Sequence, residues 1–343
     1  MFACFTPCSR GLLLVALMMG RSPLRAEDPQ TPMSMLIAVQ ASTGLYAEGL
    51  KPWYSKMEVQ LYDPAGKPTE TGTIEEWWSG PGLGKIRYSM PSHASTSLTK
   101  SGKHYRSADS SYVGYFLQKL QNMLVRPIPG TGELAERSAE LHKGSLHNVP
   151  IDCITLKDNK SMPGDGFCVS PDGKSLRAVV GNDTIMVLLN NVGTFQLRQV
   201  AVDLLIQAGD VTRATGHLVA LTTRPMPDGV YATDGLIEDT IAANETKCVA
   251  PGGTPQVVQP KLLSSRKPDY PLNARSQRRT GAVVIFGIIG LNGRIHSLEV
   301  LSTTDSDMAE AALDAIREWR YAPYMLNGIA VETETLIHVN FLL

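Results

Sequence analysis

Hydrophobic and polar residues alternate over much of the segment from Glu27 to Cys248, a pattern typical of β-strands with one buried face. In KMEVQLYD, for example, Met57, Val59 and Leu61 fall on one side of a strand. Turn signals such as PAG and GPGLG separate further strand-like runs at hairpin spacing. The pattern therefore predicts a large, mostly antiparallel β domain.

One segment of this region has helical rather than strand periodicity. In DSSYVGYFLQKLQNML, the positions of Tyr115, Phe116 and neighbouring apolar residues fit one face of a helix. Asp109 or Ser110 is placed to cap its start, and Pro127 is placed to end it. We therefore expect a helix that crosses the sheet.

The last quarter of the chain has the clearest pattern. GAVVIFGIIG and IHSLEVLS flank Asn292-Gly293, a strong hairpin turn signal. STTDSDMAEAALDAIREW predicts an amphipathic helix, which one of Asp305, Ser306 and Asp307 is placed to cap. ETETLIHVNFLL predicts a final strand. The order β-β-α-β predicts a small antiparallel sheet with one helix on it, so the expected fold class of the whole chain is α+β.

The apolar stripe of that predicted helix consists of Met308, Ala311, Ala312, Ala315, Ile316 and Trp319. Trp319 ends the stripe, and we expect it to be buried against the sheet.

Length and composition divide the chain into four regions. With 343 residues the chain is too long for one ordinary core. VAPGGTPQVVQP, residues 249–260, is rich in Pro and Gly and is predicted to be a linker. The predicted regions are a signal peptide (1–26), a β-rich domain (27–248), the linker (249–260) and a C-terminal domain (261–343).

The N-terminus has the pattern of a cleavable secretory signal. Arg10 precedes an apolar run from Gly11 to Gly20, and Ala26 offers a small-residue cleavage site. The run is about half of the ~20 residues that a membrane helix needs, and an uncleaved anchor is the alternative. No later stretch is long and apolar enough to span a membrane. The sequence therefore predicts a periplasmic or otherwise extracytoplasmic protein without a stable membrane span after cleavage.

Charge and motif searches exclude several classes of function. The net charge of −1 gives no global basicity that would favour nucleic acid binding. CxxC and HExxH spacings are absent, so we predict no metal site and no cofactor. SGPGLGKI lacks the first glycine and the Ser or Thr of a phosphate loop, and no GxSxG occurs. An enzyme is therefore not expected.

Three cysteines follow the predicted signal. Cys153 in IDCITLKD and Cys168 in GFCVSPDG lie in strand-like pieces around a turn-rich loop. In an oxidising compartment we expect these two to form a disulfide. A buried free thiol, or a bond of either residue to Cys248, is the alternative, and the role of Cys248 stays open.

The C-terminal segment resembles the C-terminal domain of TonB-type energy transducers. The residues that carry the resemblance are DYPLNAR, GAVVIFGIIGLNGRIHSLEVLS, MAEAALDAIREWRYAPYMLNG and VETETLIHVNF, within about residues 261–343. The resemblance implies a domain that binds outer-membrane receptors. In that family a Tyr-Pro segment ahead of the first strand helps to contact the receptor plug, and the matching positions are Tyr270, Pro271, Ala274 and Arg275. The alternative is that Tyr270 packs on its own domain.

The last strand, residues 332–342, is expected at an edge of the small sheet. Glu332 and Glu334 place charge near its start, as natural edge strands often do. LIHVNF beyond them has no charged residue apart from His338, so this edge is suited to bind an extended peptide by strand addition. In the resembled family a short receptor segment pairs there. The strand residues predicted to bind a partner are Leu336, Ile337, His338, Val339, Asn340 and Phe341. Pairing of two copies into a homodimer is the alternative.

The N-terminal region is similar in pattern, and in EEWWSGPGLGKIRY, to periplasmic carriers of the LolA type. That resemblance implies an open half-barrel whose concave face holds an acyl chain; the alternative is a packed core. Energy transducers usually have an uncleaved membrane helix and a long Pro-rich spacer, whereas this chain is predicted to have a cleavable signal, a short spacer and a β domain. Three hypotheses follow: receptor binding in TonB-type transport, carriage of a lipid or other apolar ligand with a docking module, and a dimerisation module.

Overall fold

The computed structural model describes residues 31–108, 112–135, 137–146, 148–157, 163–181, 185–239, 257–326 and 328–343. The predicted signal peptide, the predicted caps Asp109 and Ser110, and Cys248 lie outside the described residues. Within these ranges no helix has the length and apolar character needed to cross a membrane.

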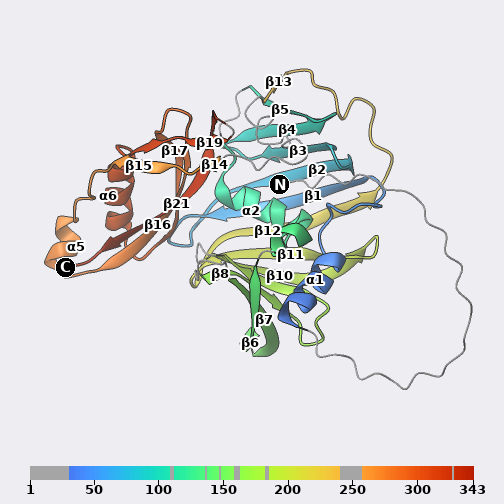
Figure 1. The fold of residues 1–343 in the computed structure, drawn as a ribbon, viewed down its shortest axis with the longest axis horizontal. Coiled ribbons are helices and arrows are strands. Elements are labelled where there is room, and N and C mark those ends of the chain that lie inside the picture. Colours follow the sequence, from blue (N-terminus) through green and yellow to red (C-terminus); the bar gives the residue numbers. More distant parts are fainter. Residues whose placement is uncertain are drawn as a thin grey trace, which may run out of the picture.

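The N-terminal domain is built on one large antiparallel sheet, in which thirteen strands are described (Figure 1). In chain order they are β1 (Trp53–Tyr62), β2 (Pro68–Gly80), β3 (Leu83–Ser89), β4 (Ala94–Lys100), β5 (Lys103–Ser107), β6 (Ser138–Leu146), β7 (Val149–Lys157), β8 (Pro163–Val169), β9 (Leu176–Val180), β10 (Ile185–Phe195), β11 (Arg198–Ala208), β12 (Val211–Thr223) and β13 (Leu236–Glu238). Their order in the sheet is β13-β5-β4-β3-β2-β1-β12-β11-β10-β9-β8-β7-β6. Two meanders, β1–β5 and β6–β12, are thus joined where β1 pairs with β12.

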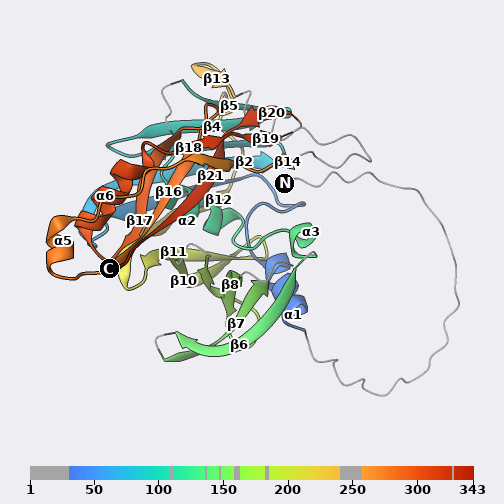
Figure 2. The same cartoon turned by 60° about the vertical axis from the view of Figure 1, so that its left-hand side comes forward.

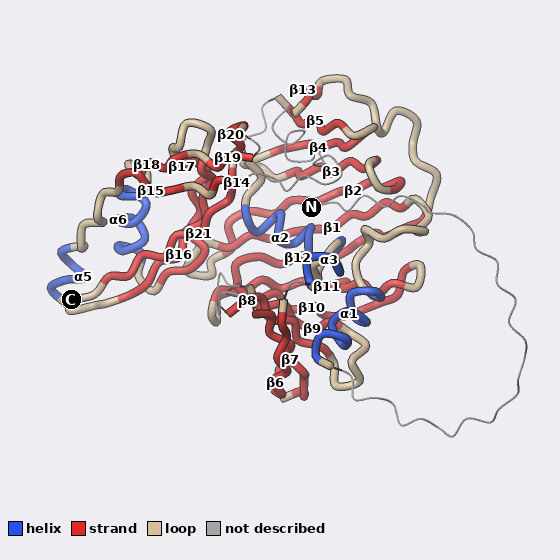
Figure 3. The backbone as a smooth tube through the Cα atoms, viewed as in Figure 1, coloured by secondary structure: helices blue, strands red, loops and turns tan. Residues whose placement is uncertain are grey.

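Helices cover one face of this sheet (Figure 3). They are α1 (Pro32–Ser42), α2 (Tyr115–Val125) and the short α3 (Thr131–Leu134). α2 buries Phe116, Leu117, Leu120 and Leu124 against strands that include β11 and β12. The predicted crossing helix is therefore present, but its described part begins at Tyr115, later than the sequence pattern suggested.

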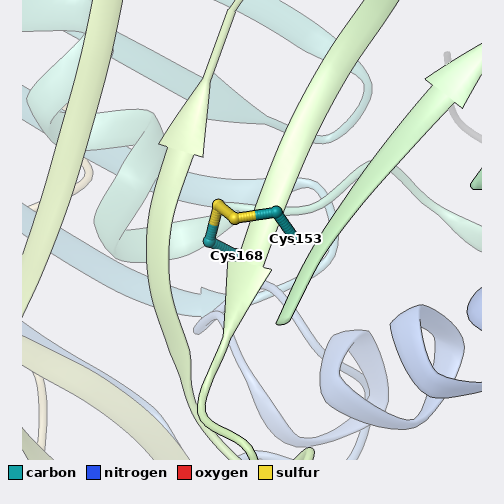
Figure 4. The surroundings of a disulfide bond; sticks show 2 residues. All are labelled: Cys153 and Cys168. Atoms are coloured by element: carbon teal, nitrogen blue, oxygen red, sulfur yellow. A yellow bond between two sulfur atoms is a disulfide. The ribbon is translucent and has the colours of Figure 1, made fainter. Parts of the chain in front are cut away.

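The disulfide between Cys153 and Cys168 is present, as predicted (Figure 4). The two residues are direct neighbours on the adjacent strands β7 and β8, with their Cα atoms 3.9 Å apart. The bond lies beside a small apolar cluster that includes Ile151 and Leu188. It joins the two strands near the β6 end of the sheet, where α1 contacts β6 and β7.

The C-terminal domain has the predicted β-β-α-β order. β16 (Gly281–Ile289), β17 (Ile295–Thr303) and β21 (Thr333–Phe341) form an antiparallel sheet in the order β17-β16-β21. α6 (Ser306–Ile316) packs on it, and Asp305 caps α6 by accepting hydrogen bonds from the backbone N–H groups of Asp307 and Met308. Gly293 has φ 72° in the hairpin turn, and a Cβ there would collide with the carbonyl oxygen of Tyr321.

Trp319 differs from its expected position. α6 ends at Ile316, so Trp319 lies beyond the helix and is only half-buried against the C-terminal core. Its indole Nε1–H donates a hydrogen bond to the carbonyl of Arg266 at 2.8 Å. The residue therefore ties the incoming chain to the end of α6, in addition to its packing.

Short elements surround the C-terminal sheet. They are β14 (Val257–Val258), β15 (Lys261–Ser264), α5 (Leu272–Ser276), β18 (Arg320–Ala322), β19 (Tyr324–Leu326) and β20 (Ile329–Val331). β14 pairs with β19, and β15 pairs with β18. Val257 and Val258 fall within the predicted linker, so the end of that segment is part of the folded structure.

The two faces of the C-terminal sheet have different coverings. Val283, Ile285 and Ile289 of β16 belong to a core that they share with α6. Val284 and Phe286, which alternate with them, belong instead to the core of the N-terminal domain. Figures 1 and 2 show the C-terminal sheet lying against the region of α2 and β12.

Candidate partner-binding site

β21 is an edge strand of the C-terminal sheet. It pairs with β16 from Gly281–Phe341 to Ile289–Thr333, and no other described strand pairs with it. One row of its backbone N–H and C=O groups is therefore left without a strand partner among the described residues. Such a row is a template for the addition of an extended chain.

The predicted residues of β21 divide into two sets because side chains alternate along a strand. Ile337, Val339 and Phe341 are buried in the core beneath α6. Leu336, which is 38% exposed, and His338 and Asn340 face away from that core. A partner at this edge would therefore meet the backbone and the exposed set, while the buried set holds the strand in place.

The opposite edge of the same sheet is engaged by the N-terminal domain. Arg213 of β12 is 4% exposed, and its Nη2 donates a hydrogen bond to the carbonyl of Val300 on β17 at 3.0 Å. Its Nη1 donates a second hydrogen bond to the carbonyl of Leu301. β17 thus has a resident partner for two of its carbonyls, whereas β21 has none described.

The Tyr-Pro segment lies at the C-terminal end of β21. The hydroxyl of Tyr270 donates a hydrogen bond to the carbonyl of Arg279, and its ring meets that of Phe341 edge to face at 5.6 Å between centroids. Pro271 is the N-cap residue of α5. These contacts bind the segment to its own domain, which agrees with the alternative that Tyr270 packs there.

The other two predicted residues of this segment differ in exposure. Ala274 is fully buried, at 0% exposed, and Arg275 is exposed. Of the four, Arg275 is therefore the residue whose side chain is most available to a partner, and Ala274 acts on a partner only by fixing α5.

Positive charge is left unpaired around α5. Between residues 261 and 279 the sequence has six basic residues and one acidic residue. Arg266 pairs with Asp269 and Glu318, and Arg279 pairs with Asp305 and Asp307. The remaining basic residues, Lys261, Lys267, Arg275 and Arg278, are exposed and form no ion pair with another described residue. The surface near the end of β21 is therefore basic.

Arg213, which bonds the opposite edge of the sheet, is a residue whose role the sequence pattern did not reveal. Arg213 lies in a strand whose neighbours are small, TRATG, and a charged residue there is typical of a solvent-facing position. Its burial follows only from the contact with a domain distant in sequence. The sequence of β16 does contain a sign of the domain contact, because its almost unbroken apolar run predicts burial on both faces. The sequence of β12 contains no such sign.

The two faces of the large sheet have hollows of very different size. A cavity between Thr43, Leu124 and Leu189 measures about 10 Å³, which is less than a single water requires. The opposite face has an open groove of about 870 Å³. Its lining includes no aromatic residue and mixes polar side chains, among them Glu58, Asp203 and His217, with the apolar Val59, Leu204 and Leu205.

A titrating carboxyl group lies in the core beneath α2. Glu76 of β2 is 1% exposed and accepts hydrogen bonds from the hydroxyl of Tyr46 and, at 3.0 Å, from Nε2 of Gln121. Burial raises the pKa of Glu76 to about 7, although both hydrogen bonds act in the opposite direction. The N-terminal domain therefore has a group in its core that changes charge near neutral pH.

Comparison with known proteins identifies the C-terminal segment. Residues 266–343 match the family model described as Gram-negative bacterial TonB protein C-terminal. Protein TonB of Escherichia coli (strain K12) is 34% identical over 65 residues, which are 19% of this chain and 27% of that protein. The chain thus spans about a quarter of the length of this relative. The resemblance of the C-terminal segment to the TonB family is confirmed.

Three solved structures are also similar to parts of the chain. A DUF1329 family protein from Desulfovibrio piger has a TM-score of 0.40 at 9% identity, covering 58% of this chain and 95% of that one. A LolA superfamily protein from Nitrosomonas europaea has a TM-score of 0.33 at 9% identity, covering 60% and 98%. The TonB C-terminal domain of Pseudomonas aeruginosa has a TM-score of 0.22 at 27% identity, covering 24% and 86%. Such scores do not establish a shared fold.

Proposed function

We propose that this protein works in the periplasm and binds an extended segment of a cell-envelope partner by strand addition to β21. By the family resemblance, the partner is an outer-membrane receptor in TonB-type transport. The observation that carries the proposal is the difference between the two edges of the C-terminal sheet. Arg213 bonds the carbonyls of β17, and β21 has no described strand on its outer side.

The backbone of β21 supplies the affinity in this proposal, and exposed side chains supply selectivity. Alternate residues of the incoming strand would lie beside Leu336, His338 and Asn340. The unpaired basic residues around α5 favour a segment with acidic residues near the end of β21. Arg275 is the basic residue that both the family resemblance and its exposure select.

The direct test is a titration of the isotope-labelled full chain with peptides from N-terminal segments of outer-membrane receptors of the same cell. We expect amide shifts along Leu336–Phe341 and no comparable shifts in α6. Shifts that map to α6 would contradict strand addition. An edge already filled by a second copy, which peptides do not displace, would favour the homodimer instead, and light scattering of the same sample separates these outcomes.

Two proline variants make the test sharper. Successive residues of a strand direct their backbone N–H groups to opposite sides. Of the two variants His338→Pro and Val339→Pro, one therefore removes an N–H group that faces the open edge. The other removes an N–H group that is bonded to β16. The outward variant should abolish peptide binding with the smaller loss of stability. Equal effects of the two variants on both binding and stability would contradict the proposal.

No second function is proposed. The carrier hypothesis, in which the large sheet holds a lipid or other apolar ligand, stays a prediction. No catalytic role is proposed either.

A further inference from the structure

The C-terminal domain presses an aromatic residue into the N-terminal domain. Phe286 of β16 is 1% exposed. Its ring stacks on Tyr112 at 5.4 Å and meets Tyr115 at 5.1 Å between centroids. Val284, Ile288 and Leu301 join the same buried cluster. The docked face of the C-terminal sheet is thus apolar and centred on the start of α2.

The start of α2 is capped by a residue of the C-terminal domain. Gly114 is the N-cap residue and provides no side-chain cap. The backbone N–H of Tyr115 instead donates a hydrogen bond to Oε2 of Glu299 on β17, at 2.8 Å and 184 positions away in the sequence. A carboxylate is favourable at this end of a helix because free N–H groups and the positive end of the helix dipole meet there. α2 therefore obtains its cap only when the C-terminal domain is docked.

Arg213 makes the reciprocal contact from the N-terminal domain. Its guanidinium bonds the carbonyls of Val300 and Leu301, and it also lies over the ring of Phe116 at 4.7 Å. Arg213 and Glu299 each reach across the domain boundary to backbone groups of the other domain. We call this pair the clamp.

The far side of α2 contacts the buried carboxyl group of the large sheet. Gln121, almost two turns after Tyr115, donates to Oε2 of Glu76 at 3.0 Å. The rings of Trp53 and Trp78 stack beside this group at 5.8 Å between centroids, and Tyr46, which donates to Glu76, stacks on Trp78 at 6.5 Å. One helix thus connects the clamp with a titrating group and two tryptophans.

The C-terminal domain also has a hydrophobic core of its own. Val283, Ile285, Ala312, Ile316 and Val339 belong to this core, which does not include the N-terminal domain.

We propose that the Arg213–Glu299 clamp fixes the start of α2 against the C-terminal domain, and that α2 couples this contact to Glu76 in the core of the large sheet. In this device Glu299 is a positioning residue: it fixes the start of α2, and through α2 the side chain of Gln121. The inference goes beyond the proposed function, because it holds whether or not a partner adds a strand to β21.

Several charged and titratable groups surround Glu299 and Glu76 and influence the pH at which the two carboxyl groups titrate. Glu299 faces Arg213 of β12 and Tyr112 ahead of α2. Tyr112 also faces Glu334 of β21, which in turn interacts with Lys119 of α2. Glu76 faces Tyr46, Gln121 of α2 and Tyr88 of β3, and Tyr231 feels its charge. A shift of α2 moves Gln121 relative to Glu76 and thereby changes the pH at which Glu76 titrates, which the neighbouring tryptophans report by fluorescence.

The test compares Glu299→Ala with Glu299→Gln in the full chain. Glu299→Ala removes the cap, so hydrogen exchange of the amides of residues 115–118 should become about fivefold faster, as the loss of a typical cap implies. The midpoint of the tryptophan fluorescence titration should also shift from that of the wild type. Glu299→Gln keeps an acceptor oxygen and should restore both readouts. Glu332→Ala removes an exposed carboxylate of the same domain that pairs with His296, and it should change neither.

The outcomes separate the parts of the inference. Unchanged exchange in residues 115–118 would overturn the clamp, and faster exchange without a shift in the fluorescence midpoint would overturn the transmission through α2. If Glu299→Ala does not fold, Arg213→Lys is tested by the same two measurements. This variant keeps the positive charge but loses the guanidinium group that bonds the carbonyls of Val300 and Leu301. Peptide binding at β21 is measured separately, so failure of the proposed function leaves this result interpretable.

Discussion

β17 and β21 are the two outer strands of the same three-stranded sheet, and the rest of the chain meets them in different ways. Two carbonyls of β17 are bonded by the buried Arg213, and Glu299 on the same strand caps α2. The outer side of β21 has no described strand partner, and Leu336, His338 and Asn340 are exposed. The N-terminal domain therefore bonds the backbone of β17, whereas it meets β21 through the side chain of Glu334, which faces Tyr112 and Lys119.

The largest expected effect on stability distinguishes the docked face of the C-terminal sheet from its open edge, and it concerns Phe286 and Leu336. These residues are direct neighbours on β16 and β21, but Phe286 is 1% exposed and Leu336 is 38% exposed. Phe286→Ala should lower the free energy of unfolding by about 3–5 kcal/mol, because it leaves a cavity at the domain boundary. Leu336→Ala should lower it by less than about 1 kcal/mol. Chemical denaturation of both variants checks the comparison, and similar losses would mean that the docked face is not buried in solution.

The pH dependence of stability tests the burial of Glu76 beneath α2. The ordinary pKa of Glu76 is 4.5, and burial raises it to about 7 in the folded protein. The folded protein then binds this proton more tightly than the unfolded chain does. The contribution of Glu76 to the free energy of unfolding should be greatest below about pH 4.5, fall as the pH rises to about 7, and level off above it. The loss is at most about 3 kcal/mol for a shift of this size.

Glu76→Gln keeps the shape of the side chain and should remove this part of the pH dependence. Burial also raises the pKa of Glu299 to about 7, so a smaller slope of the same sign should remain in that variant. Glu58→Gln, an exposed change on the neighbouring strand β1, is the matched control and should leave the slope as it is. Equal slopes in Glu76→Gln and the wild type would contradict the assignment.

The next effect concerns the occupied edge itself. Arg213→Ala leaves the carbonyls of Val300 and Leu301 without their charged donor, and should lower the free energy of unfolding by about 1.5–3 kcal/mol. Arg275→Ala, which removes an exposed arginine near β21, should change it by less than about 0.5 kcal/mol. Thermal and chemical denaturation provide the values. A small effect at Arg213 would show that β17 does not depend on the N-terminal domain.

The smallest expected effect concerns binding at the open edge. Arg275→Glu reverses an unpaired charge near the end of β21 and should weaken the binding of an acidic peptide by about 1 kcal/mol, or roughly fivefold. The loss should diminish at high salt. Lys174→Glu makes the same charge change on an exposed loop of the N-terminal domain and serves as the control. Calorimetric titrations that give equal affinities for the two variants would exclude a role for Arg275.

Features with a local cause were predictable from the sequence. The cap by Asp305, the Asn-Gly turn and the alternation in β21 each depend on a few adjacent residues, and the structure has all three. The Cys153–Cys168 bond followed from two strand-like pieces at hairpin spacing. Periodicity and turn chemistry suffice in such cases because the interacting groups are close in sequence.

The start of α2 was not predictable in this way. The pattern pointed to a local cap at Asp109 or Ser110, and the observed cap of the described helix comes from Glu299. Likewise, the apolar run of β16 indicated that both faces of the strand are buried, but not that the N-terminal domain covers one of them. Contacts between segments that are distant in sequence produce no local pattern of residues, so they cannot be predicted from spacing.

The register of β21 has a mechanical consequence. β21 and β16 pair over nine residues, from Gly281–Phe341 to Ile289–Thr333, in antiparallel directions. A tethered partner strand that is pulled along its own axis would load the hydrogen bonds of this edge in shear, so that many bonds share the force instead of opening one after another. In the proposed complex the load would pass from β21 to β16, whose Phe286 packs on Tyr112 and Tyr115. Arg213 and Glu299 connect the neighbouring strand β17 to the same region of the N-terminal domain.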